Sequence, residues 1–373
     1  MDGMYKIESI QALRFFAALL VVIDHTLLAL TSAGSLPSST NEVAWLLGEM
    51  GVYVFFSISG FIMLITNKER FGRDRAIGDF LVRRIVRVAP IYWLFTTWVV
   101  LSSIINADPI TLEQTWKSYL FIPVANTLGQ MRPLHGVGWT LNYEMLFYGV
   151  FAATMALRFR TGVIAVLAAL AGFVFAGCVL RTPFDLGEPQ GLLEVWTSPI
   201  LLLFGLGVLI GLARFRFGVV AWPISPWILG AAMVLPLIAF YLKGDPLSVW
   251  WRVFAAVTAA GVVTLAAFTR LPLGAVRLLV RGGDASYSLY LVHTFVIGTL
   301  SRRLPDLAGH QPVLFFLTAV SASIAAGFLT RAIIEKPLTR LFWAGATHLH
   351  SALGLNRAPK RPPPPPSIHP DGA

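Results

Sequence analysis

Long apolar blocks dominate the chain, and residues 161–180 are the clearest of them, with 20 consecutive residues that carry no charge. A helix of about 20 apolar residues spans the roughly 30 Å hydrocarbon core of a bilayer. Only 13% of all residues are charged, against roughly a quarter in soluble domains. The sequence therefore predicts an all-α fold, a polytopic bundle of transmembrane helices.

About ten spans are expected, and residues 1–342 form the transmembrane domain. The spans are residues 10–30, 43–66, 88–106, 139–157, 161–180, 196–213, 218–242, 249–268, 285–301 and 312–334. After Trp343 the composition changes, and Arg361 is followed by five consecutive prolines. Because such a composition does not form a packed core, residues 343–373 are predicted to be a disordered cytoplasmic tail.

The Lys and Arg residues between the spans predict the orientation. With the N-terminus in the cytoplasm, 20 of them lie in inner segments and 6 in outer loops. Positive residues concentrate on the cytoplasmic side of membrane proteins, so both termini are expected to be cytoplasmic. This bias, together with contact with anionic lipid, accounts for the net charge of +10, and nucleic-acid binding is not expected.

The first span carries two ionisable residues on one face. Arg14 and His25 are eleven residues apart, which is three turns and about 20°, or about 16 Å along the helix axis. Ionisable groups inside a span are costly and by default mark a functional site. The orientation places Arg14 in the inner half and His25 in the outer half. Asp24 points away from His25 around the helix and is not expected to be its partner.

The second span contains small polar residues among aromatic ones, including Ser59 and Gly60. Small residues let helices approach closely, so this segment could be a packing seam. It could also line a substrate path.

The inner loop at 67–87 is the most basic part of the chain and ends with Arg83, Arg84 and Arg87. Spacings of three and four residues would cluster these guanidinium groups on a short helix. They could be ordinary anchors at the inner interface, beside an aromatic belt at Tyr92. Alternatively they could bind phosphate, which the planar fork of arginine suits.

Glu144 opens the fourth span from the outer side, at a depth that we expect to be comparable to that of His25. A carboxylate within a span is costly. Glu144 could orient His25, bind a hydroxylated acceptor, or pair with an arginine for structure.

In the ninth span, Ser286, Tyr290 and His293 form one polar stripe. His293 could be a structural, hydrogen-bonded histidine or part of a polar path. At the inner end of the tenth span, Arg331 and Glu335 are four residues apart and could neutralise one another.

Six motifs with matching order and topology now point to a family. They are Arg14 with His25, Phe-Phe-x-x-Ser-Gly-Phe at 55–61, Arg-x-x-Arg-x-x-Pro-x-Tyr-Trp at 84–93, Trp-x-Leu-x-x-Glu at 139–144, Ser-Tyr-x-x-Tyr-Leu-x-His at 286–293 and Glu-x-Pro at 335–337. Over about residues 5–340, the chain resembles the membrane acyltransferase 3 family, whose members O-acylate bacterial surface and secreted carbohydrates.

The resemblance implies an enzyme of the bacterial inner membrane that transfers an acetyl group from cytoplasmic acetyl-CoA to a hydroxyl of a carbohydrate or glycolipid. Such acceptors include exopolysaccharide, lipopolysaccharide and Nod factor. The three arginines at 83–87 would hold the phosphates of CoA, and Arg14 would meet its arm. His25 would be the general base, and Glu144 would orient it or hold the sugar. An acetyl-histidine intermediate is the competing mechanism.

Further residues are expected to line the substrate path, and no metal is expected. These path residues are Ser59, Tyr92, Trp139, Tyr290 and His293. Partner proteins of a glycan export pathway could assist the enzyme. The alternative function is a transporter or flippase of a lipid-linked saccharide, because intramembrane charges and polar stripes are also typical of transporters.

Overall fold

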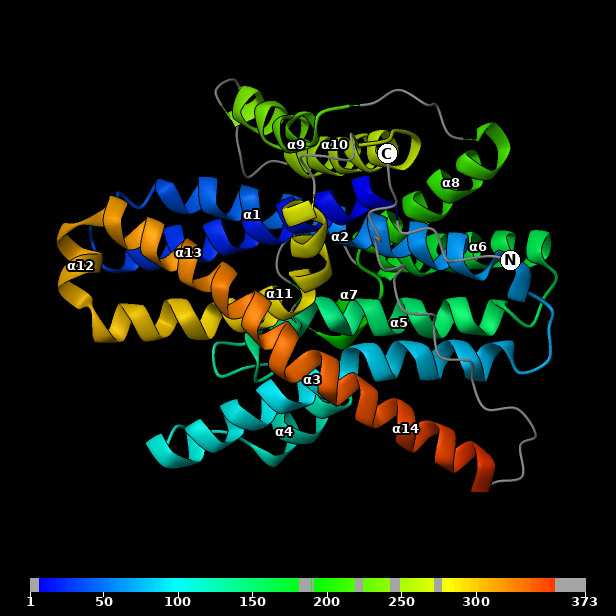
Figure 1. Ribbon diagram of the computed structural model, residues 1–373, viewed down its shortest axis with the longest axis horizontal. Helices are drawn as coiled ribbons and strands as arrows, with labels where there is room; N and C mark the ends of the chain where they lie inside the picture. Colours follow the sequence, from blue (N-terminus) through cyan, green and yellow to red (C-terminus); the bar gives the residue numbers. More distant parts are fainter. Residues whose placement is uncertain are drawn as a thin grey trace, which may run out of the picture.

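The computed structural model describes residues 7–180, 189, 191–218, 224–241, 249–271 and 277–352. This part of the chain is helical, apart from loops and one isolated bridge between Ala125 and Met131. Most of the long helices run along the long axis of the molecule (Figure 1). The all-α fold class expected from the sequence is confirmed.

The helices of the described part follow one another in a simple order. The α-helices are α1 (Glu8–Ser32), α2 (Thr40–Asn67), α3 (Ala76–Asn106), α4 (Leu112–Tyr119), α5 (Trp139–Thr154), α6 (Phe159–Leu180), α7 (Leu192–Trp196), α8 (Leu201–Phe217), α9 (Pro226–Tyr241), α10 (Val249–Phe268), α11 (Arg277–Arg303), α12 (Pro305–His310), α13 (Pro312–Thr330) and α14 (Lys336–Ala352). Shorter segments are the 3₁₀ helices η1 (Lys68–Arg70) and η2 (Gly136–Gly138) and the π-helix η3 (Arg331–Glu335).

Seven helices of the described part are long and apolar enough to cross a membrane, as expected of a multi-pass membrane protein. Helices α5 and α9 have 16 residues each, and α11 is longer but more polar. A helix lies in each of the ten ranges expected to span. The count of ten spans and the cytoplasmic position of both termini stay predictions.

Two helices are longer than expected. Helix α3 begins at Ala76, twelve residues before the expected start of its span, so the arginines at 83–87 belong to the same continuous helix as the apolar segment. Helix α14 continues to Ala352, so the first ten residues of the expected disordered tail are helical. Residues 353–373 lie outside the described residues.

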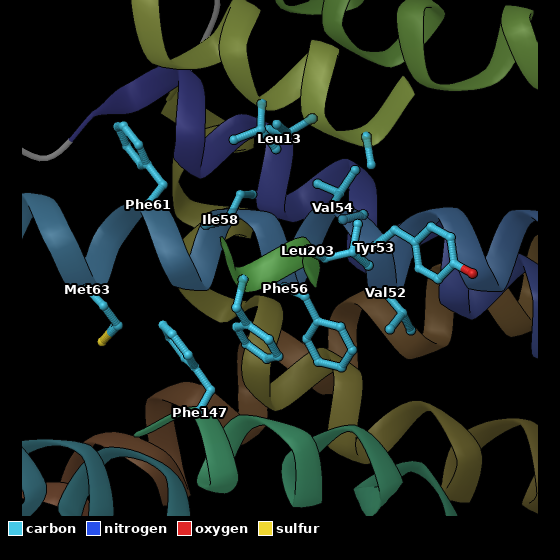
Figure 2. Close-up of a cluster of buried hydrophobic side chains, with 14 of the residues drawn as sticks. Leu13, Val52, Tyr53, Val54, Phe56, Ile58, Phe61, Met63, Phe147 and Leu203 are labelled. Carbon is cyan, nitrogen blue, oxygen red and sulfur yellow. The ribbon is translucent and has the colours of Figure 1, made fainter. Parts of the chain in front are cut away.

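Helix α2 lies at the centre of the bundle and packs most closely against α1 and α8. Figure 2 shows its side chains pointing in several directions, with Phe56 near Phe147 of α5 and Leu203 of α8. Phe56 and Phe147 each pack on the ring of Phe204, at centroid distances of 4.6 and 4.4 Å. Between helices in lipid such van der Waals contact is a main source of stability.

The contact between α2 and α8 depends on glycine. A Cβ atom on Gly60 would lie 2.0 Å from the backbone oxygen of Phe204, and one on Gly207 would lie 2.0 Å from that of Ser57. The two backbones therefore touch, as the packing-seam interpretation predicted for Gly60. The neighbouring Ser59 contacts Glu144 of α5 instead.

This contact predicts a stability defect. Gly207→Ala should destabilise the protein by about 1–3 kcal/mol, because the added methyl group forces α2 and α8 apart. The unfolding midpoint of the purified protein in detergent measures the effect. Gly149→Ala is the matched control, since nothing lies within 4 Å of its added Cβ. Equal midpoints for the two variants would show that the bundle tolerates a wider α2–α8 spacing.

Candidate active site

Glu144 lies in a polar cluster between α2, α3 and α5. Its Oε1 accepts a hydrogen bond from the hydroxyl of Ser59 at 3.1 Å and another from the hydroxyl of Tyr148, one turn further along α5. The charges of Arg14 and Arg84 lie within electrostatic range of this carboxylate. We call these residues, together with Arg87 and Glu335, the inner cluster.

The inner cluster carries an excess of positive charge. Arg14 lies within electrostatic range of Arg87, Glu144 and Glu335, so three guanidinium groups face two carboxylates. The guanidinium of Arg84 lies over the ring of Tyr148, with its carbon 5.9 Å from the ring centroid, and its Nε has no hydrogen-bond partner in the described part of the chain. A buried donor without a partner beside surplus positive charge suits an anionic ligand.

The structure separates the three arginines of α3 that the sequence grouped together. Arg84 and Arg87 face Arg14, whereas Arg83 is less deeply buried and lies within electrostatic range of Arg70 and Asp79. Successive residues of a helix are 100° apart, so Arg83 and Arg84 cannot share one face fully. Arg83 is therefore at the edge of the inner cluster.

Tyr92 does not lie in an aromatic belt at the inner interface. Its ring is fully buried and stacks on Phe121 of the connection between α3 and α5, with centroids 4.8 Å apart. The next residue, Trp93, donates from Nε1 to the backbone oxygen of Tyr119 in the same connection. The longer α3 moves both residues towards the middle of the helix and brings them against the outer connection.

His25 lies at the centre of a second group, eleven residues after Arg14 on α1. Its Nδ1 is 3.0 Å from the backbone oxygen of Val21 and 3.2 Å from Oδ2 of Asp24. The imidazole side chain is 31% exposed, so a substrate can reach it. The expectation that Asp24 is not a partner of His25 is wrong, because the imidazole turns back along α1 and meets the carboxylate.

His293 of α11 packs against His25. The two rings meet edge to face with centroids 4.9 Å apart. The Nδ1 of His293 is 3.2 Å from the backbone oxygen of Leu289, and its Nε2 has no hydrogen-bond partner in the described residues. A carbonyl oxygen only accepts, so Nδ1 carries the proton and Nε2 is left as a buried acceptor. We call Asp24, His25 and His293 the outer cluster.

Tyr290 lies one turn before His293 and connects α11 to the start of α5. Its hydroxyl donates to the backbone oxygen of Val137 at 2.8 Å and lies 2.9 Å from the hydroxyl of Thr140. Trp139, between these two residues, packs edge to face on Tyr143. Of the expected stripe on α11, Ser286 turns away, because its hydroxyl donates to the backbone oxygen of Gly283.

Glu144 is not in contact range of His25 as expected, because its hydrogen bonds are made to Ser59 and Tyr148 in the inner cluster. Arg331 and Glu335 also differ from expectation. Arg331 pairs with Asp284 of α11 at 3.4 Å, and Glu335 accepts a hydrogen bond from Ser288. The π-helix η3 has a different residue spacing from an α-helix, so the i,i+4 geometry does not hold there.

The connection between α4 and α5 closes the outer side of the site. His135 is buried between Phe95 and Phe295, and burial lowers the pKa of His135 to about 4, so its imidazole is neutral at physiological pH. Arg132 lies within electrostatic range of both His25 and Tyr290. It also lines a cavity of about 190 Å³ on this connection.

Sequence reasoning missed three residues of the site: Asp24, Arg132 and Tyr148. For Tyr148 a signal existed, because it follows Glu144 by four residues and so shares its helix face. For Arg132 no local pattern could have shown its proximity to α1. Among the described residues, no group of three or more His, Cys, Asp or Glu is arranged to hold a metal ion.

Comparison with known proteins assigns the chain to a family. The family model described as an acyltransferase domain matches residues 7–332, which is most of the chain. The chain belongs to the acyltransferase 3 family. Membership makes the protein an acyltransferase and decides against the transporter alternative.

Three curated relatives cover most of the length of this acyltransferase. Exopolysaccharide production protein ExoZ of Rhizobium meliloti (strain 1021) is 32% identical over 305 residues, which is 79% of this chain and 90% of that protein. Nodulation protein 10 of Rhizobium leguminosarum bv. viciae is 25% identical, covering 88% and 92%. Acyltransferase MdmB of Streptomyces mycarofaciens is 24% identical, covering 90% and 92%. No solved structure matches the acyltransferase at a significant level.

The position of Glu144 in this acyltransferase predicts a defect of activity rather than of folding. Glu144→Gln keeps the shape of the side chain but removes the charge that balances Arg14 and Arg84, so we expect kcat/KM to fall by about 10- to 100-fold, or 1.4–2.7 kcal/mol. Transfer rates and the amount of protein in the membrane should be measured together. Disappearance of the variant from the membrane would instead favour a purely structural role for Glu144.

Proposed function

We propose that this chain is an O-acyltransferase of the bacterial inner membrane that moves an acetyl group from cytoplasmic acetyl-CoA to a hydroxyl of a polysaccharide or glycolipid. Two observations support a carbohydrate acceptor: one relative is named for exopolysaccharide production and another for nodulation. The geometry that supports the proposal best is that of α1, which carries Arg14 in the inner cluster and His25 in the outer cluster.

The inner cluster suits the donor. Arg84 and Arg87 lie on the part of α3 that follows the basic inner loop, and their positive charge exceeds that of the nearby carboxylates. Arginine binds phosphate through paired N–H groups, and such charge-assisted hydrogen bonds are strong where water is excluded. Arg84, Arg87 and, at the edge, Arg83 would hold the phosphates of CoA. Arg14 would meet the arm that carries the thioester.

The outer cluster suits the chemical step. Nδ1 of His25 faces two acceptors, the backbone oxygen of Val21 and the carboxylate of Asp24, so its Nε2 is free to take a proton. His25 would remove the proton of the acceptor hydroxyl while the oxygen attacks the thioester carbonyl. The carbon–sulfur bond then breaks, and His25 returns the proton to the departing thiolate. The products are the O-acetyl ester and free CoA.

The path between the clusters would carry the acetyl group outward. Arg14 and His25 are about 16 Å apart along the axis of α1, so the arm of the donor must extend through the bundle. Ser59 lies at the inner end of this interval, and Tyr290 and His293 lie at its outer end. Tyr92 and Trp139 would bound the path through their aromatic packing.

The acceptor would approach from the outer side. The cavity lined by Arg132, Gln114 and Asn126 is open on that face, and Arg132 connects it electrostatically to His25. Charged and amide side chains suit the hydroxyl groups of a sugar. Partner proteins of a glycan export pathway would deliver the acceptor there.

Two experiments test the proposed function. Proteoliposomes with the purified acyltransferase, radiolabelled acetyl-CoA and a bacterial glycan extract should show label transferred to carbohydrate. In cells, deletion of the gene should remove an acetyl group from one glycan, which mass spectrometry detects as the loss of one acetyl mass per modified sugar. Unchanged glycans in the deletion strain, with no transfer in proteoliposomes, would contradict the proposal.

A further inference from the structure

Asp24 is a buried carboxylate with an unusual set of partners. Only 6% of the residue is exposed. One carboxylate oxygen, Oδ2, lies 3.2 Å from Nδ1 of His25, and the other, Oδ1, has no hydrogen-bond partner in the described part of the chain. A buried carboxylate is costly unless a counter-charge offsets its desolvation. The cation within reach of Asp24 is the one that His25 becomes when it takes a proton.

The place of this carboxylate is set by the contact between α1 and α2. A Cβ atom on Gly48 of α2 would lie 2.3 Å from Oδ2 of Asp24 and 2.8 Å from its carboxyl carbon. Any residue larger than glycine at position 48 would therefore push the carboxylate away from its present position. The tight approach of two helices holds Asp24 against the imidazole.

The other groups around His25 make the carboxylate more important. His293 packs on the imidazole from α11, and Arg132 acts on it from the connection between α4 and α5. The positive charge of Arg132 opposes a second positive charge on His25. Asp24 is the acidic group on the page that offsets this repulsion, and its attraction becomes strong only when His25 is protonated. An interaction that strengthens as the proton moves stabilises the transition state more than the ground state.

We propose that Asp24 is a positioning residue for His25, held in place by the absence of a side chain at Gly48. Together with the backbone oxygen of Val21, its carboxylate keeps the proton of the neutral imidazole on Nδ1, which leaves Nε2 as the base. During the step it stabilises the imidazolium and stays ionised itself. This inference rests on the proposed role of His25 as the general base.

Asp24→Asn is the first test. An asparagine amide can donate to Nδ1 and favour the tautomer with the proton on Nε2, so kcat should fall by about 10²–10⁴-fold, as for a comparable loss in a serine protease triad. The KM values for acetyl-CoA and for the acceptor should change by less than about threefold, since no substrate contact is removed. A kcat within about threefold of wild type would overturn the proposal.

Gly48→Ala is the second test, because it keeps Asp24 but displaces its carboxylate. We expect the same selective loss of kcat, whereas Gly149→Ala, which meets nothing within 4 Å, should behave as wild type. If Gly48→Ala keeps full kcat, the helix contact does not set the position of the carboxylate, and that part of the proposal is wrong. Membrane abundance and detergent unfolding midpoints identify a variant that fails to fold.

A readout without activity separates this inference from the proposed function. ¹⁵N NMR of histidine-labelled protein should show Nδ1 of His25 protonated in wild type, with the Nε2-protonated form added in Asp24→Asn. Identical His25 signals in the two proteins would overturn the role of Asp24 even if His25 is the base. Conversely, failure of the proposed function would appear as no acetyl transfer by the wild type, while the NMR difference would persist.

Discussion

His25→Ala should abolish acetyl transfer while the protein stays in the membrane at wild-type abundance. Loss of a general base alone costs about 10²–10⁴-fold, and here the imidazole lies beside a carboxylate and a second histidine, so its removal disrupts the whole outer cluster. The rate of transfer from radiolabelled acetyl-CoA in proteoliposomes measures the effect, and immunoblotting of membranes measures abundance.

His310→Ala is the matched control for this prediction. His310 lies at the exposed end of α12, so its loss should leave the rate unchanged. Normal O-acetylation of glycans in a strain that carries His25→Ala would refute the central role of His25. The competing acetyl-histidine mechanism also predicts inactivity, but it further predicts that label stays on the denatured wild-type protein when the acceptor is withheld.

The double variant Arg84→Ala/Arg87→Ala should raise the KM for acetyl-CoA by at least about tenfold, with a smaller change in kcat. Each charge-assisted hydrogen bond to a phosphate contributes about 1.5–3 kcal/mol, and both side chains belong to the inner cluster. Initial rates at varied acetyl-CoA and fixed acceptor measure the KM. Transfer from a short acetyl thioester without phosphates should be less affected by the double variant than transfer from acetyl-CoA.

Two single variants sharpen this prediction. Arg73→Ala removes an exposed charge of the same inner loop and should leave the KM for acetyl-CoA near wild type. Arg83→Ala should have a smaller effect than Arg84→Ala, because Arg83 lies towards Arg70 and Asp79 at the edge of the cluster. If only the KM for the acceptor rises in the double variant, these arginines do not bind the donor.

Properties that depend on neighbours along the chain were predictable. Apolar length identified the helices, and helical periodicity placed Arg14 and His25 on one face of α1. The bounds of α3 were predicted less well, because the arginines at 83–87 interrupt the apolar pattern without interrupting the helix. An apolar scan detects the membrane segment of such a helix and not the part that continues beyond it.

Contacts between helices were not predictable in the same way. Glu144 was expected near His25, since both were placed at similar depth, but depth does not state which helix faces which. The bundle turns Glu144 towards Arg14 and Arg84. The pairing of Arg331 with Asp284 likewise depends on the π-helix η3 and on the approach of α11.

The sequence by itself determined that the chain forms membrane-length helices and that α1 carries an arginine and a histidine on one face. It also carried the motifs of the acyltransferase family. Only the tertiary structure decided that Asp24 meets His25 and that the carboxylate of Glu144 belongs with the arginines. The physical reason is that helix periodicity is a local property, whereas the partner of a buried charge depends on how closely helices approach, as at Gly48.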